Sequence, residues 1–576
     1  MKSFSDLKKS CRRDVSDFPK LKVALLGDTA TQFLAVALKG AGVDRGYNIQ
    51  LFEAEYNQVE RQILDHSSEF YGFKADYSIV FQSSHKLLES FSLSNDGERE
   101  SFCANRLAFV KELCSSVRGK IIYCNYPEIG DGVFGSFQNK VTNSFIYQLR
   151  KLNLGLMELS KEFPNLFVCD LSEISAKYGR NSFFDRSVYV NTEMVLSLVA
   201  LPVVASRMID IICAIEGKFK KCLIVDLDNT LWGGIVGDDG WENIQVGHGL
   251  GIGKVYSELQ QWIKKLRERG IIICVCSKND EIKAKEPFEK NPEMVLRLDD
   301  FAVFMANWEN KVVNLKTIQK ILNIGFDSMV FLDDNPFERN MVRENIPGIT
   351  VPELPEHAED YLEYLYELNL FETASFSATD KDRTRQYQQE AQRTSLNMSF
   401  TNEDDFLASL NMISTVEGFT PYNTPRVAQL SQRSNQFNLR TVRYTETDIK
   451  NLADDGRNVC LSFTLEDKFG DNGLIGVIIM RPLDEKTLFI DTWFMSCRVL
   501  KRGMEHFMLN TVVTEAKNAG YCSIIGEYRP TAKNAMVENF YPGLGFTKIK
   551  EVDGFMYKLS VESYTPKECH IIRKKK

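Results

Sequence analysis

The stretch CLIVDLDNTLWGG, residues 222–234, decides the fold of the middle of the chain. It opens with an apolar run typical of a buried strand, and Asp226 and Asp228 follow where the run ends. Side chains two positions apart on a strand share a face, and the carboxyl end of a strand faces the crevice where open α/β sheets bind ligands. We therefore expect both carboxylates at the ligand-binding edge of a sheet.

Two carboxylates at such an edge repel each other unless a cation lies between them. Hard oxygen ligands favour Mg²⁺, whose charge also neutralises a bound phosphate. Because Asp-x-Asp pairs also occur in solvated turns, the pair alone leaves both interpretations open. The sequence that follows it favours the metal site.

Two further apolar runs, IIICVC at 271–276 and MVFL at 329–332, each end in polar groups suited to holding a phosphoryl group. A lysine between them can supply a positive charge. If the strand ends meet at one edge, the acidic side chains surround one divalent ion and the other groups can hold the phosphoryl group. They are Ser277, Lys278 and Asn279 after the first run, Lys311, and Asp333 and Asp334 after the second.

This order resembles a known family. The motif DxDxT at 226–230, the strand-end serine, the lysine and the acidic pair match, in order, the four motifs of the haloacid dehalogenase (HAD) superfamily. The segments LDNTLWGGIVGDDG, VCSKND, NWENK and FLDDNPFER are similar to its FkbH-like branch, and the similarity runs through nearly the whole chain. It implies a HAD-like Rossmannoid domain at residues 218–365.

The resemblance also implies roles for the residues. Asp226 would attack phosphorus in line to form an aspartyl-phosphate, and Asp228 would protonate the leaving oxygen and then activate water. Mg²⁺ would be held by Asp226, the Asp228 carbonyl, and either Asp333 or Asp334. The phosphate-binding set would be Thr230, Ser277, Lys278, Asn279 and Lys311, with Lys278 alternatively a local helper charge.

The distance along the chain from Thr230 to Ser277 limits the size of any cap. A loop, a helix and a strand fill it, which leaves no room for a large cap domain. The helical stretch carries Leu259, Trp262, Ile263 and Leu266 on one stripe, so we expect it to pack on the sheet. An uncapped site admits a substrate carried on a macromolecule, and the flanking domains are candidates for its lid.

The N-terminal part, residues 1–217, alternates β-rich runs with stretches of helical period, which predicts a parallel sheet with crossover helices. ALLGDTAT at 24–31 resembles the GDS block of SGNH hydrolases, but Thr29 stands in the place of the serine nucleophile. The DxxH block is missing, because Asp185 is followed at the expected place by Val188. We expect an SGNH/flavodoxin-like α/β domain with a docking or lid role and no catalysis.

The C-terminal part, residues 366–576, contains LFIDTWFMSCRVLKRGMEHFML at 488–509. This reads as a strand, a loop and a helix whose first amides face an anionic group. It resembles the pyrophosphate-binding segment of GNAT acyltransferases, which implies a GNAT-like α+β domain with Arg498, Arg502 and Gly503 as carrier- or CoA-binding residues. Cys497, beside Arg498 and the helix start, is a candidate site for a glyceryl thioester; the alternative is an ordinary thiol.

The family resemblance implies a function. Members are associated with moving a glyceryl unit from 1,3-bisphosphoglycerate onto the phosphopantetheine thiol of an acyl carrier protein. We therefore expect a Mg²⁺-dependent phosphatase coupled to acyl transfer, with a phosphorylated donor and a carrier protein as partners. Two alternatives stay open: a phosphatase fused to an independent CoA-dependent acyltransferase, and a non-enzymatic scaffold that docks carrier proteins.

The composition excludes several other classes. With 576 residues, a net charge of −8 and 26% charged residues, the chain is neither collagen-like, disordered nor a coiled coil, and it lacks the basic balance usual for a nucleic-acid binder. Thirteen cysteines without a C-x-x-C spacing, and no apolar N-terminal stretch, predict a reducing, cytoplasmic setting. The apolar segment 195–215 contains Pro202, Arg207 and Asp210, so we expect a buried helix and no membrane span.

Overall fold

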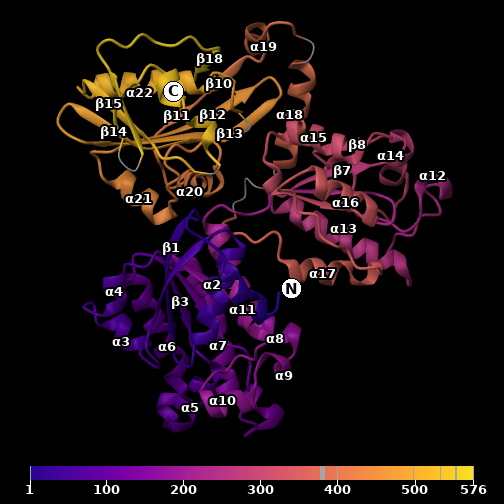
Figure 1. Ribbon diagram of the computed structural model, residues 1–576, viewed down its shortest axis with the longest axis vertical. Coiled ribbons are helices and arrows are strands. Elements are labelled where there is room, and N and C mark those ends of the chain that lie inside the picture. Colours follow the sequence, from indigo (N-terminus) through magenta and orange to yellow (C-terminus); the bar gives the residue numbers. More distant parts are fainter. Residues whose placement is uncertain are drawn as a thin grey trace. The chain divides into compact units, whose positions relative to one another are not determined.

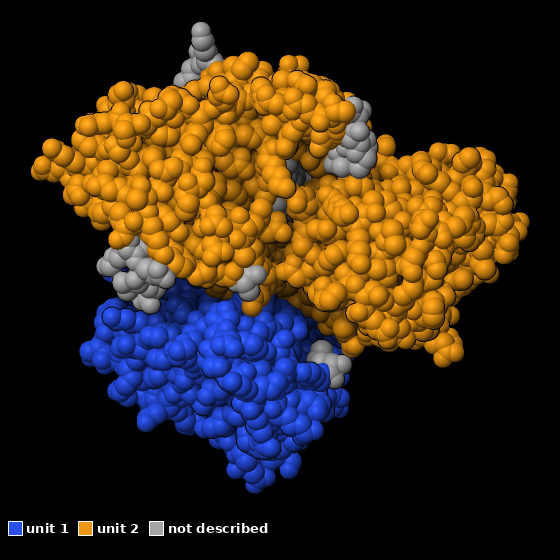
Figure 2. Space-filling model, turned by 45° about the horizontal axis from the view of Figure 1, so that its top comes forward, with its two compact units in different colours: residues 1–215 blue, residues 216–576 orange. Residues whose placement is uncertain are grey.

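The computed structural model of the chain describes residues 2–376, 383–397, 400–496, 499–531, 533–551 and 554–574. The chain divides into two compact units, residues 1–215 and 216–576 (Figure 2). Across these described ranges, no helix has the length and apolar character needed to cross a membrane. The cysteines in the same ranges are all free thiols.

The first unit is built on a five-stranded sheet whose strands are all parallel (Figure 1). Its strand order, β2-β1-β3-β4-β5, is that of a flavodoxin-like doubly wound sheet. This confirms the predicted fold of the N-terminal part. The strands are β1 (Lys20–Gly27), β2 (Asn48–Glu53), β3 (Tyr77–Phe81), β4 (Lys120–Cys124) and β5 (Leu166–Cys169).

Helices cover both faces of this sheet. Ala24 and Leu26 of β1 belong to the core that α6 and α7 close, whereas the alternate residues of the strand point to the opposite face. The helices of this unit are α1 (Phe4–Ser10), α2 (Gln32–Asp44), α3 (Val59–Leu64), α4 (Glu69–Phe73), α5 (Ser84–Leu93), α6 (Asp96–Ser116), α7 (Phe145–Glu162), α8 (Leu171–Tyr178), α9 (Arg180–Phe183), α10 (Arg186–Thr192) and α11 (Ala200–Ile215).

Helix α11 is the long apolar segment of the sequence, and it packs against α2. Most of its side chains are buried. The carboxylate of Asp210 accepts hydrogen bonds from Arg45 Nε and Nη2 at 3.1 and 2.7 Å, so the one acidic residue within the helix is paired. The prediction of a buried helix is confirmed.

The second unit begins with a four-stranded parallel sheet of order β8-β7-β6-β9. One face packs on α13 and α17 and the other on α15 and α16 (Figure 1). This is the predicted Rossmannoid arrangement. Its strands are β6 (Cys222–Val225), β7 (Ile272–Ser277), β8 (Val303–Ala306) and β9 (Met329–Leu332), and its helices are α12 (Val236–Asp239), α13 (Ile252–Glu268), α14 (Glu281–Lys290), α15 (Lys311–Leu322), α16 (Pro336–Asn345) and α17 (Tyr361–Leu368).

Only the short helix α12 and helix α13 lie between β6 and β7, a stretch that the structure describes in full. The prediction of a HAD-like domain without a large cap is confirmed. In α13, Leu259, Ile263 and Leu266 are buried and Trp262 is partly buried, as the helical stripe predicted.

The C-terminal part of this unit contains a mixed sheet of order β16-β17-β15-β14-β13-β12-β10-β18, with β11 paired to β12. β14 and β15 are parallel, and β12 and β13 form an antiparallel hairpin at DKFGDNG. The strands are β10 (Met412–Ser414), β11 (Val416–Glu417), β12 (Val459–Asp467), β13 (Gly470–Pro482), β14 (Thr487–Met495), β15 (Ser523–Tyr528), β16 (Thr547–Glu551), β17 (Phe555–Ser560) and β18 (Ile571–Arg573).

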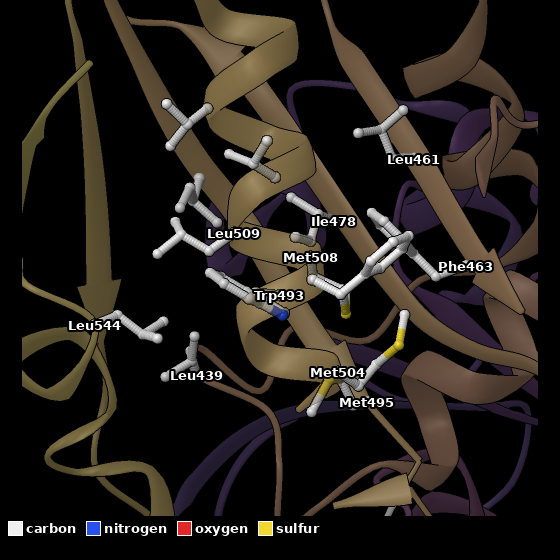
Figure 3. Close-up of a cluster of buried hydrophobic side chains, with 14 of the residues drawn as sticks. Leu439, Leu461, Phe463, Ile478, Trp493, Met495, Met504, Met508, Leu509 and Leu544 are labelled. Atoms are coloured by element: carbon white, nitrogen blue, oxygen red, sulfur yellow. The ribbon is translucent and has the colours of Figure 1, made fainter. Parts of the chain in front are cut away.

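Helix α22 (Met504–Asn518) packs on this sheet. Met504 and Met508 of the helix lie in one buried cluster with Phe463 and Trp493 of the strands (Figure 3). This packing fixes the helix start, where the predicted anion-binding loop ends. The other helices of this region are α18 (Arg383–Asn397), α19 (Glu403–Ser409), α20 (Thr424–Arg433), α21 (Glu446–Asp454) and α23 (Phe540–Gly543).

Helix α18 connects the two sheets of the second unit. Tyr387 belongs to the core of the parallel sheet, and Gln388 Nε2 donates to the Phe301 carbonyl at 2.9 Å. Five residues after Gln388, Arg393 binds both oxygens of Asp467, at the end of β12, at 2.7 and 2.8 Å. Helix α17 crosses the predicted boundary between residues 365 and 366, and its side chains remain in the core of the parallel sheet.

Candidate active site

The predicted site residues of the parallel sheet follow the carboxyl ends of three neighbouring strands. β6 leads to Asp226 and Asp228, β7 ends at Ser277, and β9 leads to Asp333. In a parallel sheet these ends lie at one edge, which explains why residues a hundred positions apart meet. Lys311 is the first residue of α15, whose start is capped by the side chain of Asn310.

Lys311 joins two of the strand ends. Its Nζ donates to Asp226 Oδ2 at 2.8 Å and to Asp333 Oδ2 at 2.6 Å, and its side chain is only 3% exposed. Burial disfavours the charged amine, but the two carboxylates outweigh burial and raise the pKa of Lys311. The predicted positive charge is therefore in place between two acids.

Three carboxylates form one compact group. Asp226, Asp333 and Asp334 each place an oxygen within 4.8 Å of the others, which confirms the predicted convergence. Burial and the neighbouring Asp226 raise the pKa of Asp333 to about 7, and the same two causes raise the pKa of Asp334. Asp226 Oδ1 is buried and has no hydrogen-bond partner. An all-oxygen donor set with an unsatisfied carboxylate oxygen fits a hard cation such as Mg²⁺.

Thr230 and Asp334 contact each other across the site. The Asp334 backbone N–H donates to Thr230 Oγ1 at 3.2 Å, and this hydroxyl lies 3.5 Å from Asp334 Oδ1. Thr230 thus orients the loop that carries the third carboxylate. Its predicted contact with phosphate remains a prediction.

Asp228 lies outside the group of three and is held by nitrogen donors. Trp232 Nε1 and the Val236 amide donate to its Oδ1 at 2.9 and 3.0 Å, and Asn279 Nδ2 donates to its Oδ2 at 2.9 Å. Burial is the main cause that raises the pKa of Asp228, and the charge of Asp226 adds to it. A carboxyl with this environment suits proton transfer.

The remaining predicted phosphate-binding residues have other contacts. Ser277 is 2% exposed at the end of β7. Asn279 contacts Asp228, and Lys278 Nζ pairs with Glu338 at 2.6 Å, the arrangement of a local helper charge. Sequence reasoning assigned no role to Trp232 or Glu338. The tryptophan lies in the family-typical stretch, but nothing in its spacing shows which carboxylate it contacts.

The second predicted site lies at the start of α22. Cys497 and Arg498 fall outside the described residues. Arg502 is 6% exposed, and its guanidinium contacts Glu390 and Asp467. Gly503 precedes the helix with φ of 76°, a left-handed conformation that favours glycine. A cavity of about 760 Å³ opens here, lined by residues that include Lys501, Arg502, Gly503, His506, Phe540 and Cys569.

Comparisons with known proteins agree with this architecture. Residues 22–213 match the model of the FkbH N-terminal domain. The chain is 67% identical to the crystallised N-terminal part of the protein BF1531 from Bacteroides fragilis, which contains a phosphatase domain complexed with Mg. That match covers 65% of this chain and 100% of the other, with a TM-score of 0.65.

The C-terminal region matches smaller proteins. The ribosomal-protein-S18-alanine N-acetyltransferase from Escherichia coli is 16% identical, over 26% of this chain and 94% of that one, with a TM-score of 0.21. A GNAT-family acetyltransferase from Staphylococcus aureus is 13% identical, over 26% and 99%, with a TM-score of 0.22. Similarity at this level identifies neither an acyl donor nor an acceptor.

No match was found among curated proteins. The family assignment therefore rests on the first of the crystal structures and on the domain model. Both agree with the motifs read from the sequence and with the strand-end site. The chain belongs to the FkbH-like family of the HAD superfamily.

Proposed function

We propose that this protein is a Mg²⁺-dependent phosphohydrolase that acts through Asp226. One observation carries the proposal: the buried ammonium of Lys311 bridges Asp226 and Asp333, with Asp334 completing a compact acidic group. Burying three neighbouring carboxyl groups costs free energy, because like charges repel, and a site for a metal ion and a phosphoryl group accounts for that cost. The crystallised relative, which contains a phosphatase domain complexed with Mg, supports the same function.

The chain's own residues supply each step of hydrolysis. The Asp226 carboxylate attacks phosphorus, an O–P bond forms, and the bond from phosphorus to the leaving oxygen breaks. Asp228 gives that oxygen its proton. In the second step Asp228 takes a proton from water, which displaces phosphate from the aspartyl-phosphate and restores Asp226. Lys311 and Ser277 bind the phosphoryl oxygens.

Asp334 is the better candidate for the second metal-binding carboxylate. Both oxygens of Asp333 already have partners, Lys311 on Oδ2 and the Asn335 amide, at 2.9 Å, on Oδ1. Asp334 contacts only the Thr230 hydroxyl through its side chain among the described residues. We assign the ion to Asp226, the Asp228 carbonyl and Asp334. When bound, Mg²⁺ offsets the negative charge that these acids share with the phosphoryl group.

We further propose that phosphate removal is coupled to acyl transfer onto an acyl carrier protein. A thiol attacks the carbonyl carbon of an acyl phosphate, a C–S bond forms, and the C–O bond to phosphate breaks. Cys497 would form the first thioester, and the carrier's phosphopantetheine thiol would then take the glyceryl group. The 760 Å³ cavity lined by Lys501, Arg502 and Gly503 supports this, since it opens at the start of α22.

The same cavity supports a second candidate, an independent acyltransferase that uses CoA. A thiol-bearing ligand of either kind would place its phosphates near Lys501, Arg502 and the first amides of α22. The two candidates differ in whether acyl transfer depends on the phosphorylated glycerate donor.

Incubation of the protein with Mg²⁺, 1,3-bisphosphoglycerate and a carrier protein tests the proposal. Mass spectrometry of the carrier should show an added glyceryl group, and phosphate release should be measured in parallel. Asp226→Asn should abolish hydrolysis of the phosphate ester while thioester formation continues, and Cys497→Ala should do the reverse. If the wild-type protein releases no phosphate, or if Asp226→Asn releases phosphate as fast as the wild type, the proposed phosphohydrolase activity is contradicted.

A further inference from the structure

We infer that Trp232 and Asn279 are positioning residues that select Oδ2 of Asp228 as the oxygen that exchanges a proton with the leaving group. The inference rests on the proposed phosphohydrolase and goes beyond it, because it names the working atom and the side chains that choose it. The family resemblance implied a phosphate-binding role for Asn279 and no role for Trp232.

The selection follows from how the two oxygens of Asp228 are occupied. A carboxylate oxygen has two lone pairs in the plane of the group. Oδ1 uses both, since it accepts from Trp232 Nε1 at 2.9 Å and from the Val236 amide at 3.0 Å. Oδ2 accepts one hydrogen bond, from Asn279 Nδ2 at 2.9 Å, and no second donor among the described residues reaches it. One lone pair of Oδ2 is therefore left to carry a proton.

The orientation of Asn279 is fixed by its other end. Its Oδ1 accepts from the Asp280 amide at 3.0 Å, which turns the NH₂ group towards Asp228. Asp280 in turn caps α14, because its side chain accepts from the Ile282 and Lys283 amides. Asn279, which donates to Asp228 Oδ2, is thus held in place by the first residues of α14. Asn279 itself is 3% exposed.

Trp232 is held just as firmly. Its side chain is fully buried, and its ring meets that of Phe288 edge-on with centroids 5.5 Å apart. The next residue, Gly233, has no room for a side chain, because a Cβ there would lie 2.6 Å from Gln245 Oε1 and 3.0 Å from Tyr256. From this buried ring the indole N–H donates to Asp228 Oδ1.

The chemical consequence concerns the first step of the reaction. As Asp226 bonds to phosphorus and the bond to the leaving oxygen breaks, the proton on Oδ2 moves to that oxygen and Asp228 becomes a carboxylate. The three N–H donors stabilise that carboxylate. A leaving group that is a poor base needs little protonation, whereas an alkoxide needs it fully, so misplacing Oδ2 harms alkyl esters more than aryl esters.

Comparing two esters in variants of the full-length protein tests the inference. Trp232→Phe removes one donor and keeps an aromatic ring, and Asn279→Leu removes the other donor at similar size. Each should lower kcat/KM for glycerol 2-phosphate at least about tenfold while lowering it about threefold or less for 4-nitrophenyl phosphate, a fraction of what general acid catalysis contributes. Using kcat/KM confines the measurement to steps up to formation of the aspartyl-phosphate.

Phe288→Leu is the matched control, because it loosens the same buried ring pair without removing a donor. It should lower the melting temperature and reduce kcat/KM for both esters by one common factor. Equal losses on the two esters in Trp232→Phe and Asn279→Leu would overturn the inference while leaving the phosphohydrolase standing. If the unmodified protein hydrolyses neither ester through Asp226, the proposed function fails first and the inference fails with it.

Discussion

Asp333 and Lys311 form a buried ion pair, with Oδ2 and Nζ 2.6 Å apart and the carboxylate fully inaccessible to solvent. The same ammonium is shared with Asp226. Removing one partner of such a pair leaves an uncompensated charge in a medium of low polarity, which costs far more than the pair contributes when intact. The site is therefore a place where charge balance and stability are linked.

Lys311→Met should destabilise the protein by about 3–5 kcal/mol in metal-free buffer, because Asp226 and Asp333 lose their shared counter-charge. Mg²⁺ should restore more of the melting temperature in the variant than in the wild type, since the ion then supplies the missing positive charge. Thermal unfolding with EDTA and with Mg²⁺ measures both effects. Lys316→Met, at an exposed position of the same helix, is the control and should change stability by less than about 0.5 kcal/mol.

Asp334→Asn should weaken Mg²⁺ binding at least about tenfold, equivalent to about 1.4 kcal/mol, because it removes the carboxylate that has the fewest protein partners. Asp333→Asn should act mainly on stability, since it breaks the ion pair with Lys311. The Mg²⁺ concentration that gives half of the maximal thermal shift distinguishes the two. A larger loss of affinity in Asp333→Asn would reassign the ligand.

Asp28 should make the first unit less stable as the pH rises. Burial raises the pKa of Asp28 to about 7 in the folded chain, against 3.8 for an ordinary carboxyl. Between these two values the folded state keeps a proton that the unfolded state releases, so stability falls as pH increases from about 4 to about 7, by up to about 4 kcal/mol.

Hydrogen exchange of β1 peptides in the full-length protein, corrected for the intrinsic rate, measures this dependence. Asp28→Asn should flatten the decline, because an amide does not titrate. Asp17→Asn, at an exposed position of the same unit, should keep the wild-type slope. A slope that persists in Asp28→Asn would assign the effect to another group.

Arg393→Met should destabilise the second unit by about 3–5 kcal/mol, because Asp467 is fully buried and loses its bidentate partner. Denaturant unfolding of the full chain measures the loss. Arg385→Met, at an exposed position of the same helix, should have little effect. A double variant that also carries Asp467→Asn should recover part of the stability, since the buried carboxylate that has lost its bidentate partner is then removed.

The strand-end chemistry was predictable because it depends on short-range rules. An apolar run followed by Asp226 and Asp228 places the carboxylates at a sheet edge, and parallel strand order then brings Asp333 and Asp334 to the same edge. The doubly wound first sheet followed from the same alternation of runs.

Contacts that depend on tertiary packing were not predictable. The indole of Trp232 reaches Asp228 only because the ring is buried against Phe288, and no spacing in the sequence encodes that direction. The polar composition of residues 383–397 did not predict a helix. Its buried side chains include Tyr387, in the core of the parallel sheet, and Arg393, which pairs with Asp467 of the mixed sheet. Strand β8 was also not predicted from the sequence.

Helix α18 binds both sheets of the second unit through two residues on the same helix. Gln388 donates to Phe301 beside the parallel sheet, and Arg393 binds Asp467 of the mixed sheet. Four residues of the helix separate these two contacts. One residue inserted between them would turn the second contact by about 100° about the helix axis and carry Arg393 away from Asp467. Evolution can therefore lengthen the loops around this segment far more readily than the segment itself.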